Sequence, residues 1–232
     1  MAERLRLLSF IDGEEGYCAL LAEAGATRAL RANGSHAWEA RSEATIEEGR
    51  ATVSTPDGEL ELAWSPAGGR LEFGVGEAVI GAQAIAASGR EPGGKLTGPG
   101  VAWDLPGEGF AALRTLWTTN ATGTLTLLVA LRPPEAGDHG EEMVGAARLI
   151  PGAEPFAYLE PLLSTEYDGA GTHVRATLEL WAGEDERAPQ RGGGLRAAGG
   201  VLSAGPGRLE AARFSWSLDG SPAAGGYEIL TP

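Results

Sequence analysis

The chain has 232 residues, 36 of them glycine and 14 proline, and a formal net charge of -14. Phosphate backbones and anionic lipid surfaces repel so acidic a protein, so we expect no nucleic acid and no anionic membrane surface among its partners. The single cysteine, Cys18, excludes an intrachain disulfide and a cluster of thiolate metal ligands.

In the first half of the chain, apolar and polar residues alternate in the manner of β-strands. Gly58–Trp64 is the clearest case, and a second alternating run follows at Leu71 and Phe73. The segment Ser65–Gly69 between them contains proline and glycine, which predicts a hairpin turn. Ala19–Ala26 is rich in helix-forming residues, but it is short and a glycine interrupts it.

The second half of the chain continues this pattern. Thr122–Leu131, His173–Trp181 and Leu209–Leu218 each gather apolar side chains on one face of a strand. Within the last run, Leu209 is out of phase with the other apolar residues, as a β-bulge would produce. Ala111–Thr118 fits a short helix and a strand equally well.

Tight-turn signals separate these runs. Asp-Gly pairs tolerate the positive φ angles of hairpin turns, and such pairs begin at Asp12, Asp57, Asp168 and Asp219. Many short strands joined by such turns predict an all-β, antiparallel fold with little helix, built as a barrel, as two packed half-barrels or as a sandwich.

Two segments rich in glycine and proline interrupt the strands. We expect Ser88–Gly100 to be a linker or a long loop, and Arg132–Gly140 to be a second break. The chain is therefore expected to form an N-terminal β-domain or half-barrel over residues 1–100 and a C-terminal one over residues 101–232.

Glu160 differs from the other carboxylates because its neighbours are apolar. If Phe156–Leu163 is extended, Glu160 shares a strand face with Tyr158. Apolar surroundings disfavour the ionised form of a carboxylate, so an inward-facing Glu160 would be suited to donate a proton. The alternative is that this face points outward, or that Glu160 pairs with an arginine such as Arg114 or Arg213.

The six tryptophans lie mainly in the strand runs. Core packing is their ordinary role, and the functional alternative is the lining of a pocket for a hydrophobic ligand. We select Trp103, Trp117 and Trp216 as candidate lining residues. Asp104, which follows Trp103, is a candidate for the polar group that orients such a ligand.

The three histidines, His36, His139 and His173, are far apart in the sequence and form no closely spaced pair of ligands. We therefore predict no metal site and no cofactor. Gly89–Thr97 approaches the pattern of a phosphate-binding loop, but Leu96 stands where that loop needs Ser or Thr, so we expect an ordinary turn.

Several segments of the C-terminal third carry a resemblance to a known family. They are Ala176–Trp181, Gly192–Gly194, Phe214–Gly220 and Gly226–Ile229. Their arrangement resembles the end of two-domain, lipocalin-like proteins of the carotenoid 1,2-hydratase superfamily. The resemblance implies a lipocalin-like barrel, and a family whose hydratases and cyclases protonate an isoprenoid double bond.

Three functions remain open. The first is a lipocalin-like protein that binds a hydrophobic, isoprenoid- or lipid-like small molecule in an aromatic-lined pocket. The second is an acid-catalysed hydratase or cyclase, in which Glu160 protonates a double bond while Tyr158 and His173 assist. The third is a β-sandwich interaction module, which exposed tryptophans on one face would indicate.

A transmembrane helix needs about 18 or more consecutive apolar residues, and no such run occurs. The N-terminal residues also lack the apolar segment of a secretory signal. We therefore expect a cytoplasmic protein without a membrane span.

Overall fold

The computed structural model describes residues 4–23, 26–33, 36–42, 49–55, 58–137, 139–183, 188–204 and 207–232. All strand pairs in these ranges are antiparallel, and the helix that they contain is the short 3-10 turn η1, His139–Glu141. This confirms the predicted all-β, antiparallel fold class. No helix within the described ranges has the length and apolar character needed to cross a lipid bilayer.

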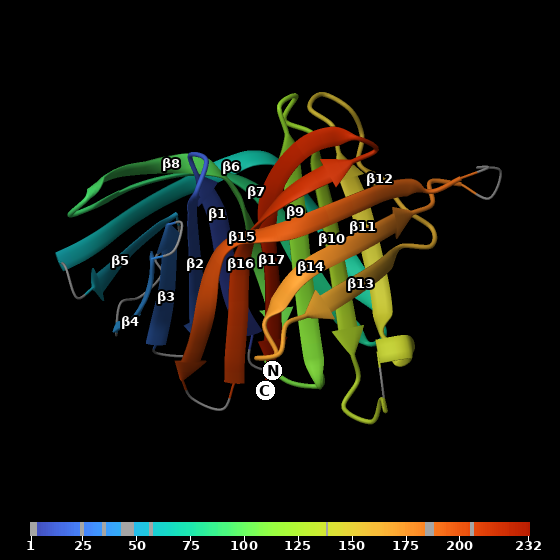
Figure 1. The fold of residues 1–232 in the computed structure, drawn as a ribbon, viewed down its shortest axis with the longest axis horizontal. Helices are drawn as coiled ribbons and strands as arrows, with labels where there is room; N and C mark the ends of the chain where they lie inside the picture. The colour runs from blue at the N-terminus through green and yellow to red at the C-terminus, as the bar shows by residue number, and fades with distance from the viewer. Residues whose placement is uncertain are drawn as a thin grey trace.

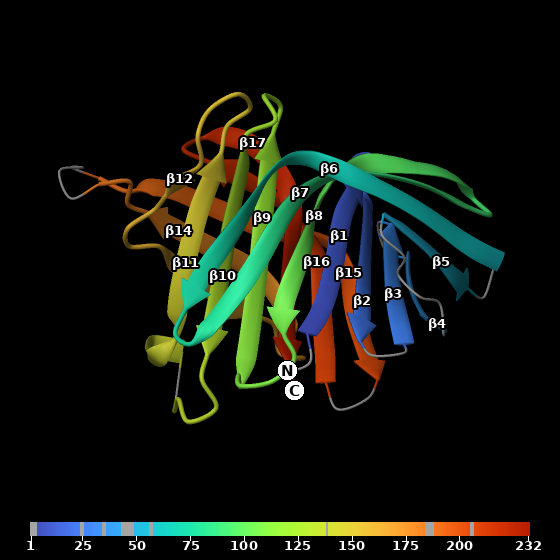
Figure 2. The ribbon, with the colours of Figure 1, turned by 180° about the vertical axis from the view of Figure 1, so that it is seen from behind.

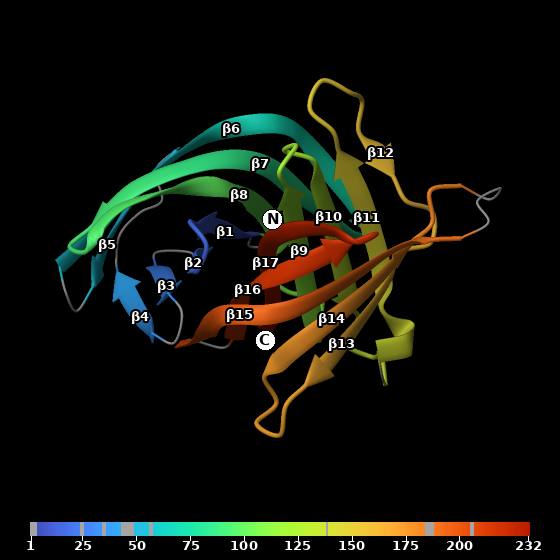
Figure 3. The same cartoon turned by 45° about the horizontal axis from the view of Figure 1, so that its top comes forward.

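The first sheet curls into a nearly closed barrel. Its eight strands follow the order β4-β3-β2-β1-β8-β7-β6-β5, and the two edge strands, β4 and β5, come into contact (Figure 3). We call this sheet the N-terminal barrel. Its strands are β1 (Arg4–Asp12), β2 (Gly16–Glu23), β3 (Ala26–Asn33), β4 (His36–Ser42), β5 (Arg50–Thr55), β6 (Gly58–Val75), β7 (Ala78–Glu91) and β8 (Gly94–Pro106).

The second sheet is a half-barrel that packs beside the first (Figures 1 and 2). Its nine strands follow the order β12-β11-β10-β9-β17-β16-β15-β14-β13. We call it the C-terminal half-barrel. Its strands are β9 (Ala112–Asn120), β10 (Leu125–Arg132), β11 (Met143–Leu149), β12 (Phe156–Ala157), β13 (Leu162–Tyr167), β14 (His173–Leu180), β15 (Gln190–Ala204), β16 (Gly207–Leu218) and β17 (Ser221–Thr231).

The two sheets share one topology. In each, the first strand pairs with the last, as β1 does with β8 and β9 does with β17, and the order breaks between the fourth and fifth strands. Both are thus up-and-down sheets in which the fourth and fifth strands are the two edges. The predicted boundary between residues 100 and 101 falls within β8, and the independence of the two halves as domains stays a prediction.

Three layers of apolar side chains fill the molecule. The central layer lies between the two sheets and includes Leu7, Trp103, Trp117 and Leu209. A second cluster around Phe10 fills the N-terminal barrel, and a third fills the C-terminal half-barrel. Strands that lie between two layers, such as β1 and β16, are therefore buried on both faces.

Burial on both faces explains the phase of Leu209. In β16, Leu209 faces the central layer, whereas Phe214 and Trp216 face the interior of the half-barrel. The bulge predicted for this run is therefore wrong. The irregularity in the β15–β16 pairing lies on β15 instead, between Arg196 and Ala198.

Two predicted breaks between strands are wrong, because the long, curled strands β6, β7 and β8 continue through these segments. β6 runs through Ser65–Gly69 and stays paired with β7 on both sides of an irregularity between Pro66 and Arg70. Within Ser88–Gly100, β7 and β8 form a hairpin whose turn occupies residues 92–93. Glycine and proline bend these strands at irregular positions without ending their pairing.

Both ambiguous segments of the sequence are strands. Residues 19–23 belong to β2 and Ala111–Thr118 lies largely in β9, because pairing and burial outweigh local helix propensity.

The turn predicted at Asp219 is confirmed, since Asp219 and Gly220 have φ angles of 47° and 79° and join β16 to β17. Asp57 lies outside the described residues.

The central layer contains a buried carboxyl group, that of Glu228. Glu228 of β17 accepts hydrogen bonds from the Tyr17 hydroxyl at 2.6 Å and the Thr115 hydroxyl at 2.9 Å. Beside it, Trp117 Nε1 donates to Ser9 Oγ at 2.8 Å. Burial raises the pKa of Glu228, and the hydrogen bonds from Tyr17 and the other donors only partly oppose this rise. These contacts tie β17 and β9 to β1 and β2 across the sheets.

We expect Glu228→Gln to change how stability depends on pH. Because the folded-state pKa of Glu228 lies above its ordinary value of 4.5, the wild type loses stability as pH rises through that folded-state pKa. Glutamine stays neutral, so the variant should gain stability relative to the wild type as pH increases. Denaturant unfolding across the pH range measures this, with exposed Glu72→Gln as the control. Parallel pH curves for wild type and Glu228→Gln would contradict it.

The pairing of β17 with β9 depends on a glycine. A Cβ at Gly225 would collide with the carbonyl oxygen of Trp117 and lie 2.7 Å from Thr118 Cα, both on the backbone of β9. Backbone atoms of a paired strand have little room to move. Gly225 therefore allows the close approach of the first and last strands of the half-barrel.

Gly225→Ala should destabilise the protein by about 1–3 kcal/mol, the usual cost of forcing extra atoms into a packed site. Gly193→Ala on β15 is the matched control, because a Cβ there would meet nothing within 4 Å. Denaturant unfolding at fixed pH gives both values. Equal stabilities of the two variants would refute the role assigned to Gly225.

Candidate functional site

A cleft opens on the side of the C-terminal half-barrel where the sheet does not close. β12 pairs with Ala147 and Arg148 of β11, and among the residues that the structure describes the first half of β11 has no strand partner at this edge. The cleft has a volume of about 670 Å³ and lies between β11 on one side and β13, β14 and β15 on the other. Its apolar wall is formed by Val144, Leu162, Leu163 and Leu178.

An ion pair buried in the cleft joins Arg114 to Glu142. Arg114 comes from β9, where it occupies the same strand face as Leu116, whose side chain belongs to the interior of the half-barrel. Arg114 Nη2 contacts Glu142 Oε2, and the two side chains are only 5% and 2% exposed. Both residues line the cleft. A charged pair with this little water around it interacts more strongly than a surface pair.

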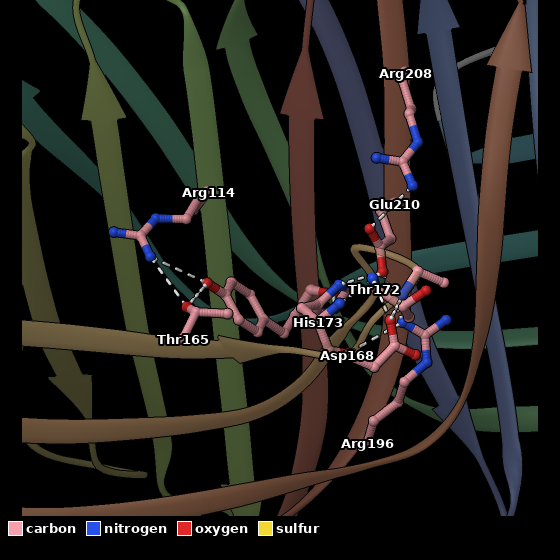
Figure 4. A network of polar contacts seen from close by, with 10 residues as sticks. Arg114, Thr165, Asp168, Thr172, His173, Arg196, Arg208 and Glu210 are labelled. Atoms are coloured by element: carbon pink, nitrogen blue, oxygen red, sulfur yellow. Dashed lines mark hydrogen bonds and ion pairs between the residues drawn. The ribbon is translucent and has the colours of Figure 1, made fainter. Parts of the chain in front are cut away.

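Two hydroxyl groups hold the Arg114 guanidinium in place (Figure 4). Arg114 Nη1 donates to Thr165 Oγ1 at 3.1 Å and to the Tyr227 hydroxyl at 3.4 Å, and these two oxygens lie 2.6 Å apart. Burial raises the pKa of Tyr227, so its hydroxyl stays protonated. Thr165 and Tyr227 are therefore positioning residues for Arg114.

A second buried network links β14 to β15 and β16 (Figure 4). His173 stacks on Phe214 and places Nδ1 2.6 Å from Glu210 Oε1. Arg196 and Arg208 reach the same carboxylate at 2.9 and 3.3 Å. Burial opposes ionisation of Glu210, but hydrogen bonds from His173 and Arg196 outweigh it and lower the pKa. None of these residues lines the cleft, so we interpret this network as structural.

Comparison with known proteins gives matches only among solved structures. No family model and no curated protein matches the sequence. A Nitrosomonas europaea protein with the provisional name AttH aligns with a TM-score of 0.63 at 11% identity, over 100% of this chain and 92% of its own. Kievitone hydratase from Nectria haematococca aligns with a TM-score of 0.62 at 9% identity, over 99% of this chain and 88% of its own.

A third match is CghA, solved with Sch210972, with a TM-score of 0.51 at 10% identity, over 99% of this chain and 88% of that one. The chain has the fold of these proteins. At such low identities the likeness extends to the fold alone. The barrel fold that the resemblance of the C-terminal segments implies is supported by this likeness, and membership of the hydratase superfamily stays a prediction.

Glu160 does not face an apolar interior. It is exposed, in a bend between β12 and β13, because the chain turns there and does not stay extended. The predicted inward orientation is therefore wrong. The proposed arginine partners are engaged elsewhere, Arg114 with Glu142 and Arg213 with the carbonyl oxygen of Gly13 at 3.0 Å.

Tyr158 and His173 are buried but do not converge on one site. The Tyr158 hydroxyl donates to Gln190 Oε1 at 2.6 Å, whereas His173 belongs to the Glu210 network. The two share no hydrogen-bonding partner among the described contacts, and Glu160 is exposed. The structure therefore does not bring the three predicted catalytic residues together, and their catalytic role stays a prediction.

The predicted ligand-binding residues are also divided between layers. Trp103 and Trp117 fill the central layer, and Trp216 fills the half-barrel. Asp104 forms an ion pair with Arg70 at 2.6 Å on β6. None of these four residues lines the cleft between β11 and β13. The tryptophan side chains that the structure describes are all buried or half-buried, at positions 64, 103, 117, 181 and 216.

The cleft depends on two residues that the sequence-based selection missed. Arg114 carries a detectable signal, because it is a charged residue within the apolar strand run Ala111–Thr118. Glu142 carries none, since it ends an acidic segment, residues 138–142, that is typical of a solvated loop. Only the folded chain brings Glu142 against β9.

A double-mutant cycle should show strong coupling between Arg114 and Glu142. Arg114→Met alone should cost about 3–5 kcal/mol, because it removes the buried guanidinium that the Glu142 carboxylate contacts, whereas adding Glu142→Leu should recover most of that loss. Denaturant unfolding of the four proteins measures the coupling. The exposed pair Arg175 and Glu166, 3.8 Å apart, is the control and should show coupling close to zero. Additive losses at Arg114 and Glu142 would contradict a buried ion pair.

Proposed function

We propose that this protein binds one hydrophobic small molecule, of isoprenoid or lipid type, in the cleft of the C-terminal half-barrel. The observation that carries the proposal is an open cleft of about 670 Å³ with an apolar wall and a buried Arg114–Glu142 pair. Ligand sites for small molecules commonly have volumes of about 300–1,000 Å³ and combine apolar walls with a few polar groups.

The mouth of the cleft also fits an apolar ligand. Leu162 lines the cleft but is 57% exposed, so an apolar side chain there faces water when nothing is bound. Burying it against a ligand removes apolar surface from water, which favours binding. Part of the cleft lining, Thr177–Glu179 and Gly192, lies in the segments that resemble lipocalin-like proteins, a fold class whose interior holds small molecules.

Leu162→Arg should weaken the binding of an apolar fluorescent dye by about tenfold or more, because a charged group would then stand in the apolar wall. A fluorescence titration with purified protein measures the dissociation constant. The matched control is Leu195→Arg, since Leu195 is 60% exposed and does not line the cleft. It should leave dye binding unchanged.

Native mass spectrometry of freshly purified protein complements the titration by detecting a ligand that remains bound. If no apolar molecule and no dye binds, the proposed function is wrong. Equal weakening by the Leu162 and Leu195 variants would place the binding site elsewhere on the surface.

A second candidate is a hydratase or cyclase reaction on an isoprenoid-like substrate. The observation that favours it is the carboxylate of Glu142 beside the Arg114 guanidinium within a ligand-sized cleft. A carboxylate there could take a proton from water while the guanidinium stabilises negative charge that develops on a substrate oxygen. Formation of product from a bound unsaturated ligand distinguishes this reaction from binding alone.

A further inference from the structure

The charged residues that line the cleft balance one another. Arg114 pairs with Glu142 in the buried part, and Arg191 Nε lies 3.2 Å from Glu179 Oε1 in the more exposed part. These are the charged side chains among the cleft-lining residues that the structure describes. The cleft therefore carries no net charge, although four of its lining side chains are ionic.

Arg114 still has a hydrogen atom to donate. Its Nη1 group is used by Thr165 and Tyr227, and its Nη2 group contacts Glu142. Its Nε atom is buried and has no hydrogen-bond partner among the described residues. Leaving a buried donor unpaired costs about 1–3 kcal/mol, so an acceptor atom brought by a ligand would be stabilised there.

From these observations we infer that the cleft selects a neutral ligand whose polar end is a carbonyl oxygen, and that Glu142 determines this selectivity. The inference rests on the proposed function of this cleft. A carbonyl oxygen accepts a hydrogen bond from Arg114 without adding charge. A carboxylate would bring an uncompensated negative charge beside Glu142 into a poorly hydrated site.

The charge of the whole protein acts in the same direction. At a formal net charge of -14, the protein repels anionic ligands before they reach the cleft. Arg114 would attract a carboxylate if it were alone, since guanidinium groups bind carboxylates well. Glu142 cancels that attraction and is therefore the specificity-determining residue.

The test compares two ligands with the same number of carbon atoms, methyl nonyl ketone and undecanoate, at neutral pH. Isothermal titration calorimetry or dye displacement measures both dissociation constants with the full chain. Wild-type protein should bind the ketone about tenfold or more tightly than the carboxylate. In Glu142→Gln the order should reverse, because Arg114 then has an unbalanced positive charge.

The matched control is Glu166→Gln. Glu166 lies on β13 and is 62% exposed, so this change alters the net charge equally without touching the cleft. It should leave the ratio of the two dissociation constants as in the wild type. Thermal unfolding verifies that each variant is folded. If Glu142→Gln does not fold, the wild-type ratio of the two ligands still tests the preference for a neutral carbonyl ligand.

Each outcome has a distinct meaning. If neither ligand binds to the wild type, the proposed function fails and this inference fails with it. If the wild type binds the carboxylate as well as or better than the ketone, the inference is wrong while the proposed function stands. If Glu142→Gln keeps the wild-type ratio, Glu142 does not determine the selectivity.

Discussion

The structure depends on two curled sheets packed against each other through their central strands. β1 and β8 of the N-terminal barrel and β9 and β17 of the half-barrel share the central layer. β1 and β9 are buried on both faces over most of their length, as is the second half of β17. This burial removes apolar surface from water on a scale that no turn or surface pair can match. Glu228, held by Tyr17 and Thr115, brings a buried carboxyl group into that layer.

The cleft follows from the same arrangement. A sheet that is anchored at its centre can vary at its edges, and the C-terminal half-barrel ends in β12, a strand of two residues. Because β12 covers only part of β11, the interior of the half-barrel opens to solvent between β11 and β13. The opposite barrel brings its edges β4 and β5 into contact. Two sheets of one topology thus differ in whether their edges meet.

The Arg114–Glu142 pair links the stability of the half-barrel to the chemistry of its cleft. Removing both charges from water costs free energy. Hydrogen bonds from Arg114 Nη1 to the hydroxyl groups of Thr165 and Tyr227 offset part of that cost. The same pairing leaves the cleft neutral, which is the basis of the proposed preference for a neutral ligand. Comparison with kievitone hydratase and AttH supports the fold and leaves this chemistry to the residues of the chain itself.

The sequence by itself determined the all-β class, the antiparallel pairing and several turns, because alternation and Asp-Gly pairs are local signals that each strand carries. The sequence-based prediction was wrong for Leu209, because a strand that is buried on both faces no longer alternates between apolar and polar residues. It failed also for Glu160, whose exposure depends on a bend in the chain. Only the tertiary structure decided the site: Arg114 and Glu142 lie on separate elements, and their pairing arises when the sheet curls and brings residue 142 over β9.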